Sequence, residues 1–204
     1  MLQLQAVESG TLELLKELMR FPLLDDFVLV GGTSLALQIG HRASVDLDFF
    51  TLNEFETDDI IALLEEHYSA FHINYKGKNT LIVEINNIKV DFIRFRYQFQ
   101  NPVIIIDNFR LLTIEDIALM KLDAINGRGR KKDFYDIFYL LEIFKLDDLL
   151  DKYKKMFLHD SVFQLIKSLT YFADAENDPD PKLIGGNVSW NEIKIFIQKQ
   201  VAAL

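Results

Sequence analysis

The spacing of hydrophobic and polar positions switches repeatedly between a helical period and strand-like alternation in the first half of the chain. Apolar residues three and four apart are typical of a helix that buries one face, whereas alternation or a short apolar run is typical of a strand. Gly40 directly follows one helical stretch, as expected after a helix C-terminus. These spacings predict helices over 11–20, 33–40 and 57–70, and strands over 27–30, 45–50, 71–85 (two strands around a turn at 76–79), 89–95 and 102–106.

From residue 113 onward the pattern is helical. Thr113 and Asp116 have the spacing of an N-terminal capping box, and a similar Ser-x-x-Glu precedes the last helix. The pattern predicts helices over 114–126, 131–144, 147–157, 161–173 and about 190–200. The expected fold class is therefore α+β, with a small mixed β-sheet and packed helices over 1–110, followed by a C-terminal helical bundle over 111–204.

Composition and charge narrow the class of protein. The chain has 204 residues, half of them apolar and 17 of them Phe, which is enough for a substantial core. The lack of cysteine excludes disulfides, thiol catalysis and cysteine-based zinc sites. Because there is no signal-peptide pattern and no run of about 18 apolar residues, we expect a cytoplasmic protein without a membrane span. A net charge of -9 argues against a protein that coats nucleic acid non-specifically.

Two charged stretches stand out from this acidic background. The RGRKK stretch at 128–132 is either a solvated basic turn or part of a local basic patch. The DAENDPDP stretch at 174–181 has a turn composition, and its acids do not have the spacing of an EF-hand loop. We therefore expect a solvated loop there.

Three aspartates lie in apolar strands, where unpaired charges are rare. In VDLDFF (45–50), Asp46 and Asp48 are two residues apart and share one strand face, while Val45 begins the apolar face. Their Cα atoms should be about 6.5–7 Å apart, a spacing that suits a pair of metal ions roughly 3.5–4 Å apart. Asp91, in KVDFIRF, is the candidate third ligand, and oxygen ligands favour Mg²⁺. The alternative is an acidic pair on an exposed strand face.

The stretch FVLVGGTS runs from a strand through Gly31 and Gly32 into a helix start. Glycine lets the backbone approach a phosphate closely, and the free N–H groups of a helix start favour an anion. The hydroxyls of Thr33 and Ser34 could add hydrogen bonds. The stretch is neither a Walker loop nor a nucleophile elbow, because both patterns are missing from the sequence. A plain turn is the alternative.

Two charged residues fall within apolar helix stripes. Lys121 lies in the middle of the stripe of helix 114–126, and Asp133 lies within the stripe of the next helix, with Asp136 on its margin. Burial of either charge without a partner would be costly. Lys121 and Asp133 therefore form either a structural ion pair or a functional pair in which Lys121 meets a substrate phosphate or nucleobase and Asp133 orients it.

Two motifs resemble a known family. The order of Gly-Gly, Asp-x-Asp and a later third Asp resembles the nucleotidyltransferase fold of the polymerase-beta type. More narrowly, GGTSLALQIGHRASVDLDFF is similar to the first motif of the AbiEii/AbiGii-type nucleotidyltransferase toxins of toxin–antitoxin and phage-defence systems. DIALMKLDAINGRGRKKDFYDIFYLLE is similar to the later Lys…Arg…Lys-Asp…Asp motif of that family. The resemblance covers roughly residues 25 to 200.

The resemblance implies a set of catalytic residues. Asp46 and Asp48 would hold Mg²⁺, with Mn²⁺ as a substitute, on a nucleoside triphosphate, and Asp91 matches the third carboxylate by order and context. Lys121 and Asp133 match the Lys and Asp of the later motif. The positions that would contact or lie near the phosphates are Gly31, Gly32, Thr33, Ser34, Arg42 and Ser44.

The resemblance also implies a function and partners. The chain would be a magnesium-dependent toxin that transfers a nucleotide from an NTP to an acceptor, with the tRNA 3′ end favoured over protein, and an antitoxin would be its partner. One alternative is a catalytically silent module on the same scaffold that senses NTP or binds a partner. Another is a metal-dependent nuclease or phosphohydrolase that uses the same carboxylates.

Overall fold

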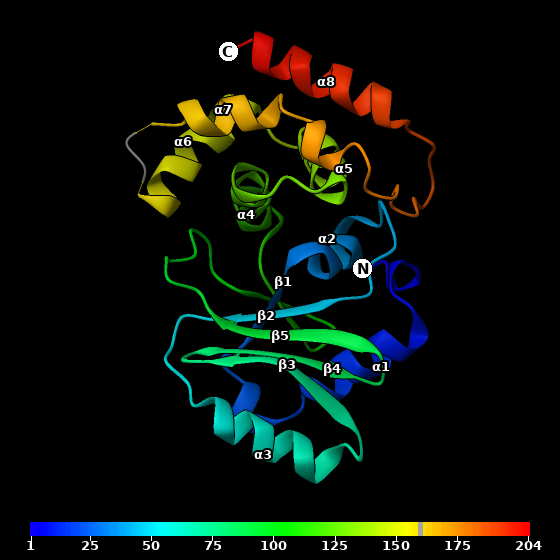
Figure 1. Cartoon of the computed structure of the whole chain (residues 1–204), viewed down its shortest axis with the longest axis vertical. Coiled ribbons are helices and arrows are strands. Elements are labelled where there is room, and N and C mark those ends of the chain that lie inside the picture. The colour runs from blue at the N-terminus through cyan, green and yellow to red at the C-terminus, as the bar shows by residue number, and fades with distance from the viewer. Residues whose placement is uncertain (159–160) are drawn as a thin grey trace. The chain divides into compact units, whose positions relative to one another are not determined.

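The computed structural model describes residues 1–158 and 161–204, and these fall into two compact units. Residues Met1–Gln98 and Pro102–Leu112 form the first, which contains the β-sheet and is called the sheet unit below. Residues Phe99–Asn101 and Thr113–Leu204 form the second, called the helical unit. Figure 1 shows the elements of both, and the predicted α+β class, a mixed sheet followed by helices, is confirmed.

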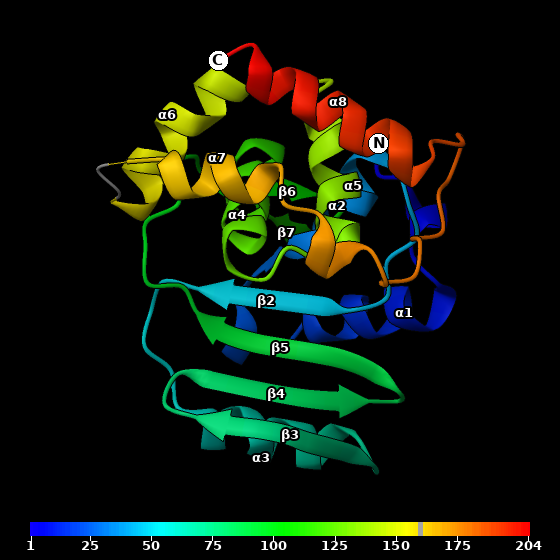
Figure 2. The ribbon, with the colours of Figure 1, turned by 45° about the horizontal axis from the view of Figure 1, so that its top comes forward.

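The sheet unit is built on a seven-stranded mixed sheet with the order β3-β4-β5-β2-β1-β7-β6. Strands β2 and β5 pair in parallel, as do β1 and β7, and the other neighbours are antiparallel. The strands are β1 (Val28–Val30), β2 (Leu47–Thr51), β3 (Phe71–Gly77), β4 (Thr80–Ile85), β5 (Ile88–Arg94), β6 (Ile104–Ile106) and β7 (Phe109–Leu111). Figure 2 shows β2, β5, β4 and β3 side by side.

Three α-helices and two short 3-10 helices complete the sheet unit. They are η1 (Leu4–Ala6), α1 (Ser9–Leu18), η2 (Pro22–Leu24), α2 (Gly31–Ile39) and α3 (Thr57–His67). Buried leucines of α1, with Ile60 and Leu64 of α3, join Phe49, Phe92 and other strand residues in one hydrophobic core. Gly40 ends α2 in the left-handed conformation, with φ of +69°, as its position in the sequence predicted.

Short hairpin turns organise the sheet, and one of them was missed in the sequence. Asn79, in the turn before β4, has positive φ, as do Asp107 and Asn108 between β6 and β7. Asn and Asp tolerate this conformation better than other non-glycine residues. The Asp-Asn turn therefore lets the chain reverse direction after β6 and form β7. Strand β7, which pairs with β1 through Leu111 and Leu29, was not predicted.

The helical unit contains α4 (Ile114–Gly127), α5 (Lys131–Leu140), α6 (Leu146–Phe157), α7 (Phe163–Leu169), η3 (Ala173–Ala175) and α8 (Trp190–Ala202). The predicted helices 131–144 and 161–173 are longer than α5 and α7, which end at Leu140 and Leu169. Both helices are followed by turns that contain hydrogen bonds from an N–H group to the carbonyl three residues earlier. The capping box before α8 is complete, with Ser189 and Glu192 hydrogen-bonded in both directions. Phe134, Phe172 and Trp190 pack ring to ring in its core.

In the part of the chain that the structure describes, no helix is both long and apolar enough to cross a membrane.

Candidate active site

Two aspartates on neighbouring strands meet on one face of the sheet. The parallel register of β2 and β5 aligns Asp48 with Asp91. The following residues, Phe49 and Phe92, are fully buried and stack with ring centroids 5.5 Å apart. Because side chains alternate between the faces of a strand, Asp48 and Asp91 point to the face opposite this aromatic pair. The structure thus brings these two predicted site residues side by side.

Asp46 lies just before this pair and is tied to helix α2. Strand β2 begins at Leu47, so Asp46 is in the connection that leads into it. Its main-chain carbonyl accepts a hydrogen bond from the Thr33 hydroxyl, and the residue is partly exposed. Val45 is 46% exposed, although alternation placed it on the apolar face. That expectation is wrong because strand pairing starts only two residues later.

Both glycines of the Gly-Gly turn have charged side chains close against them. Gly31 has φ of +67°, and a Cβ there would lie only 2.2 Å from Asp48 Oδ2. A Cβ on Gly32 would lie 2.5 Å from Arg42 Nη2. Glycine is therefore needed at position 31, where φ is positive and the Asp48 carboxylate is close, whereas the neighbour of Gly32 is the end of a long arginine side chain. Both glycines remain partly exposed, so their main chain is the accessible part of that turn.

The other residues predicted to contact phosphate are engaged inside the protein. Thr33 and Ser34 are fully buried. The Thr33 hydroxyl lies 2.9 Å from Ser44 Oγ, and Ser34 Oγ accepts a hydrogen bond from Gln38 Nε2 at 3.2 Å. Arg42 is also buried, and its Nη1 donates to the Ala43 carbonyl at 3.0 Å. These side chains hold the connection between α2 and β2, and their contact with phosphate stays a prediction.

The Asp91 carboxylate is bound by a lysine from its own strand. Lys89 Nζ lies 2.6 Å from Asp91 Oδ1 and 2.5 Å from Oδ2. Over residues 1–158 and 161–204, no group of three or more metal-ligating side chains is arranged to hold a metal ion. The predicted metal site of Asp46, Asp48 and Asp91 stays a prediction. Both oxygens of Asp91 are paired with the Lys89 ammonium group in this structure.

In the helical unit, Lys121 of α4 lies between two aspartates of α5. Its Nζ is 2.8 Å from Asp133 Oδ1 and 2.6 Å from Asp136 Oδ2. The side chains of Lys121, Asp133 and Asp136 are 9%, 1% and 0% exposed, so all three charged groups are buried. Asp133 Oδ2 is buried without a hydrogen-bond partner among the described residues. Asp133 also lies in the first turn of α5, where the helix dipole favours a negative charge.

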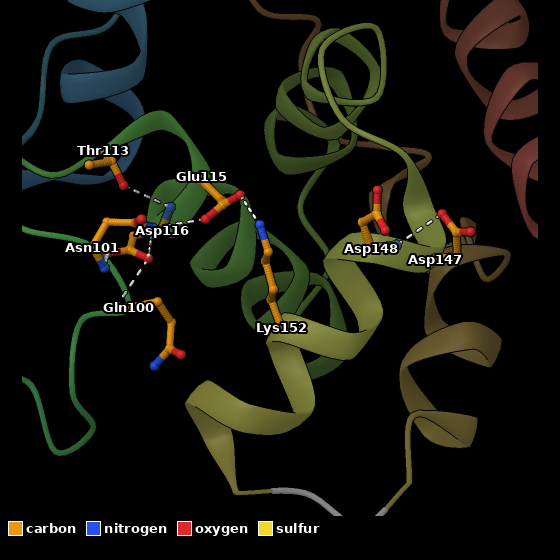
Figure 3. A network of polar contacts seen from close by, with 8 residues as sticks. All are labelled: Gln100, Asn101, Thr113, Glu115, Asp116, Asp147, Asp148 and Lys152. Atoms are coloured by element: carbon orange, nitrogen blue, oxygen red, sulfur yellow. Dashed lines mark hydrogen bonds and ion pairs between the residues drawn. The ribbon is translucent and has the colours of Figure 1, made fainter.

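A second polar network stands at the start of α4 (Figure 3). The Thr113 hydroxyl accepts a hydrogen bond from the Asp116 main-chain N–H at 3.2 Å, which caps the helix. Asp116 does not complete the predicted capping box. Its fully buried carboxylate instead accepts hydrogen bonds from the main-chain N–H groups of Gln100 and Asn101, at 3.3 and 3.0 Å, and from the Asn101 side chain. Burial raises the pKa of Asp116 above its ordinary value, against the opposing effect of these hydrogen bonds.

Glu115, the neighbour of Asp116, has the opposite shift. Burial by itself would raise the pKa of Glu115, but hydrogen bonds from Lys152 and Asn101 outweigh it and lower that pKa below its ordinary value. Figure 3 shows Lys152 reaching Glu115 from α6. The network thus joins residues 100–101, α4 and α6 of the helical unit.

The acidic stretch 174–181 is mostly exposed, which agrees with the predicted solvated loop, but it also contacts the start of α5. Asp178 Oδ2 accepts a hydrogen bond from the Lys131 main-chain N–H at 3.1 Å and thereby satisfies the N-terminus of α5. Lys131 Nζ donates to the Glu176 carbonyl and lies 3.3 Å from Asp180 Oδ1. The RGRKK stretch is therefore not uniformly solvated, since Lys131 is buried and contacts Glu176 and Asp180.

Sequence reasoning missed Lys89 as a partner of the candidate site and gave Asp136 no role. Both had a signal in the spacing. Lys89 is two residues before Asp91 in an alternating strand, which places both on one face. Asp136 is three residues after Asp133, about one helical turn. Both carboxylates therefore lie on the same side of α5 and can reach Lys121.

Comparison with known proteins extends over most of the chain. Residues 13–198 match the family described as "Nucleotidyl transferase AbiEii toxin, Type IV TA system". The protein aq_aa25 of Aquifex aeolicus (strain VF5) is 34% identical over 194 residues, which cover 93% of each chain.

Two solved structures are similar at lower sequence identity. JHP933 from Helicobacter pylori has a TM-score of 0.59 and 19% identity, and the match covers 97% of this chain and 92% of that one. MenT4, a nucleotidyltransferase toxin from Mycobacterium tuberculosis H37Rv, has a TM-score of 0.57 and 15% identity, with coverage of 95% and 83%. At these identities the likeness shows a shared fold, and the predicted nucleotidyltransferase fold is confirmed.

Proposed function

This chain belongs to the AbiEii family of nucleotidyltransferase toxins, and on that premise we propose that it uses Mg²⁺ to transfer a nucleotide from an NTP to the 3′ end of tRNA. The observation that carries the proposal is the position of the Asp48 carboxylate. It lies so close to Gly31, the first residue of α2, that any Cβ there would overlap it. A carboxylate beside the N-terminus of a helix supplies two things that a metal-bound triphosphate needs, an oxygen ligand and an anion-binding helix end.

Asp46 and Asp48 fit a hard divalent cation. Both offer carboxylate oxygens and both residues are partly exposed, with Asp46 directly before β2 and Asp48 at its second position. Mg²⁺ prefers such ligands and commonly completes its shell with water and substrate phosphate, and Mn²⁺ would substitute for it. When bound there, the ion would neutralise charge on the phosphate oxygens as pyrophosphate leaves.

The glycine turn would seat the triphosphate. The first N–H groups of a helix have no partner within it, and in α2 these belong to Gly31, Gly32 and Thr33. The Arg42 guanidinium lies against Gly32 and adds positive charge to the same turn. Direct phosphate contact would thus come from main-chain groups more than from the buried Thr33 and Ser34 hydroxyls.

In the helical unit, we propose that Lys121 and Asp133 orient a polar group of the substrate, with Asp136 holding Lys121 charged. The support is the Asp133 Oδ2 atom, a buried acceptor that has no partner in the described chain. A donor from the substrate would satisfy it.

The acceptor and the antitoxin belong to the same proposal. Transfer to the tRNA 3′ hydroxyl would inactivate a molecule on which all translation depends, which suits a toxin. Protein is the competing acceptor. The family belongs to type IV toxin–antitoxin systems, so we expect an antitoxin gene beside this one.

The proposal is tested by incubating the protein with each α-³²P-labelled NTP, Mg²⁺ and either total tRNA or total cellular protein. We expect labelled tRNA and released pyrophosphate, both lost on chelation of Mg²⁺ and in an Asp46→Asn, Asp48→Asn double variant. The exposed Asp59 of α3 supplies the control, because Asp59→Asn should retain activity. Transfer by the double variant would overturn the assignment, labelled protein would replace tRNA as acceptor, and free phosphate or mononucleotide would indicate a hydrolase.

A further inference from the structure

Lys89 occupies the position at Asp91 that a second metal ion would need. Its ammonium group contacts both oxygens of that carboxylate, at 2.6 and 2.5 Å. The Asp91 side chain is only 11% exposed, so it has little room for an additional ligand from solvent. The Lys89 ammonium group is therefore the cation at the Asp91 carboxylate in this structure.

Lys89 pairs with Asp91 although a second carboxylate, that of Glu84, is also within reach. On the neighbouring strand β4, Glu84 is directly opposite Lys89 in the antiparallel register, and directly opposite side chains lie close enough to pair. The ammonium group nevertheless lies on Asp91, two residues along its own strand. The less exposed carboxylate has the greater need of a counter-charge, because burial removes its hydration.

The parallel register places Lys89 among the other site carboxylates as well. Val90 of β5 is aligned with Leu47 of β2. Lys89 directly precedes Val90, and Asp46 directly precedes Leu47. One residue later, Asp48 is aligned with Asp91. Asp46 and Asp48 are partly exposed and can receive an ion from solvent, whereas the largely buried Asp91 is paired with Lys89.

We infer that Lys89 is the resident cation of this site, so that Asp91 binds no metal ion and the metal is confined to Asp46 and Asp48. Lys89 is thus a positioning residue that replaces a second ion. This inference rests on the proposed function, because it assumes a metal at Asp46 and Asp48. It predicts that the number and affinity of bound ions depend on Lys89, whether or not the protein is turning over.

Electron paramagnetic resonance of Mn²⁺ titrated into the full-length protein measures both quantities without activity. A Lys89→Met, Asp91→Asn double variant replaces the ion pair by neutral side chains and should leave Mn²⁺ affinity and stoichiometry as in the wild type. Lys89→Met should raise the affinity about tenfold or add a second ion, because a nearby ammonium no longer opposes the metal. Lys76→Met is the matched control, since Lys76 is also 44% exposed and pairs with Asp58 at 2.5 Å, and it should change nothing.

The outcomes separate this inference from the proposed function. If the Lys89→Met, Asp91→Asn double variant binds Mn²⁺ about tenfold more weakly than the wild type, Asp91 is a ligand and the inference is overturned, even if Lys89→Met alone does not fold. An unchanged affinity in folded Lys89→Met overturns it too. If an Asp46→Asn, Asp48→Asn variant binds Mn²⁺ as the wild type does, the metal assignment of the proposed function fails instead.

Discussion

Replacing Lys121 by methionine should be among the most destabilising single changes in the helical unit. At an effective dielectric constant of about 20, each of its two contacts, at 2.8 and 2.6 Å, carries about 6 kcal/mol of gross attraction, which the desolvation of three ions largely offsets. Methionine fills a similar volume but removes the ammonium group from both carboxylates, which stay buried. Removal of one partner from a buried ion pair costs about 3–5 kcal/mol.

Differential scanning calorimetry and urea unfolding measure this loss. For a chain of this size, about 3–5 kcal/mol corresponds to a fall of roughly 6–20 °C in Tm. Lys154→Met is the control on the same unit. Its ion pair with Asp151 has the same length, 2.7 Å, but both side chains are well exposed, so solvent screens the attraction and Tm should barely move.

A charge-neutral variant distinguishes a stabilising role of this cluster from a role in substrate binding. With Lys121→Met, Asp133→Asn and Asp136→Asn together, no buried charge is left unpaired, and most of the lost stability should return. If nucleotidyl transfer stays absent while stability returns, the cluster acts on substrate. A loss below about 1 kcal/mol in Lys121→Met alone would refute the reasoning, because a cluster this buried cannot then be ionised.

Gly31→Ala should abolish nucleotidyl transfer and lower Tm, because its Cβ would overlap the Asp48 carboxylate. Gly10→Ala in α1, whose Cβ would meet no atom of the described chain within 4 Å, should keep transfer unchanged and should not lower Tm. Urea unfolding from pH 3 to 7 should reveal opposite trends at the start of α4. The raised pKa of Asp116 means that its contribution is complete below its ordinary value of 3.8 and is lost as pH rises, so the stability gap between wild type and Asp116→Asn should narrow with rising pH. The lowered pKa of Glu115 means that its contribution is present above 4.5 and is lost in acid, so the gap for Glu115→Gln should narrow with falling pH, and parallel trends would contradict both assignments.

The elements that sequence predicted best are those in which a single residue spacing dictates the geometry. Alternation in β2 and β5 was enough to place Asp48 and Asp91 on faces that could meet, since the opposite positions were aromatic and had to be buried. The contact of Gly31 and Gly32 with phosphate stays a prediction, and their closest neighbours here are protein side chains. These neighbours are 10 to 17 positions away in the sequence, so residue spacing does not reveal them.

What the sequence could not supply is the choice among competing partners. Lys89 has acidic neighbours on its own strand and on β4, and only the relative burial of Asp91 and Glu84 separates them. The hydrogen bond between Asp178 and the N-terminus of α5 was not predicted, because α5 begins 47 residues earlier. Strand β7 was missed because three residues after a two-residue turn give too short a pattern to detect.

The short segment Phe99–Asn101 limits how this protein can be dissected. The chain moves from one compact unit to the other at 98/99, 101/102 and 112/113, so neither unit is a contiguous piece of the sequence. A gene fragment that starts at Thr113 would encode all five α-helices of the helical unit but would lack the donors that satisfy Asp116. Truncations and chimeras that exchange the helical unit should therefore carry residues 99–101 with it, for example through a circular permutation.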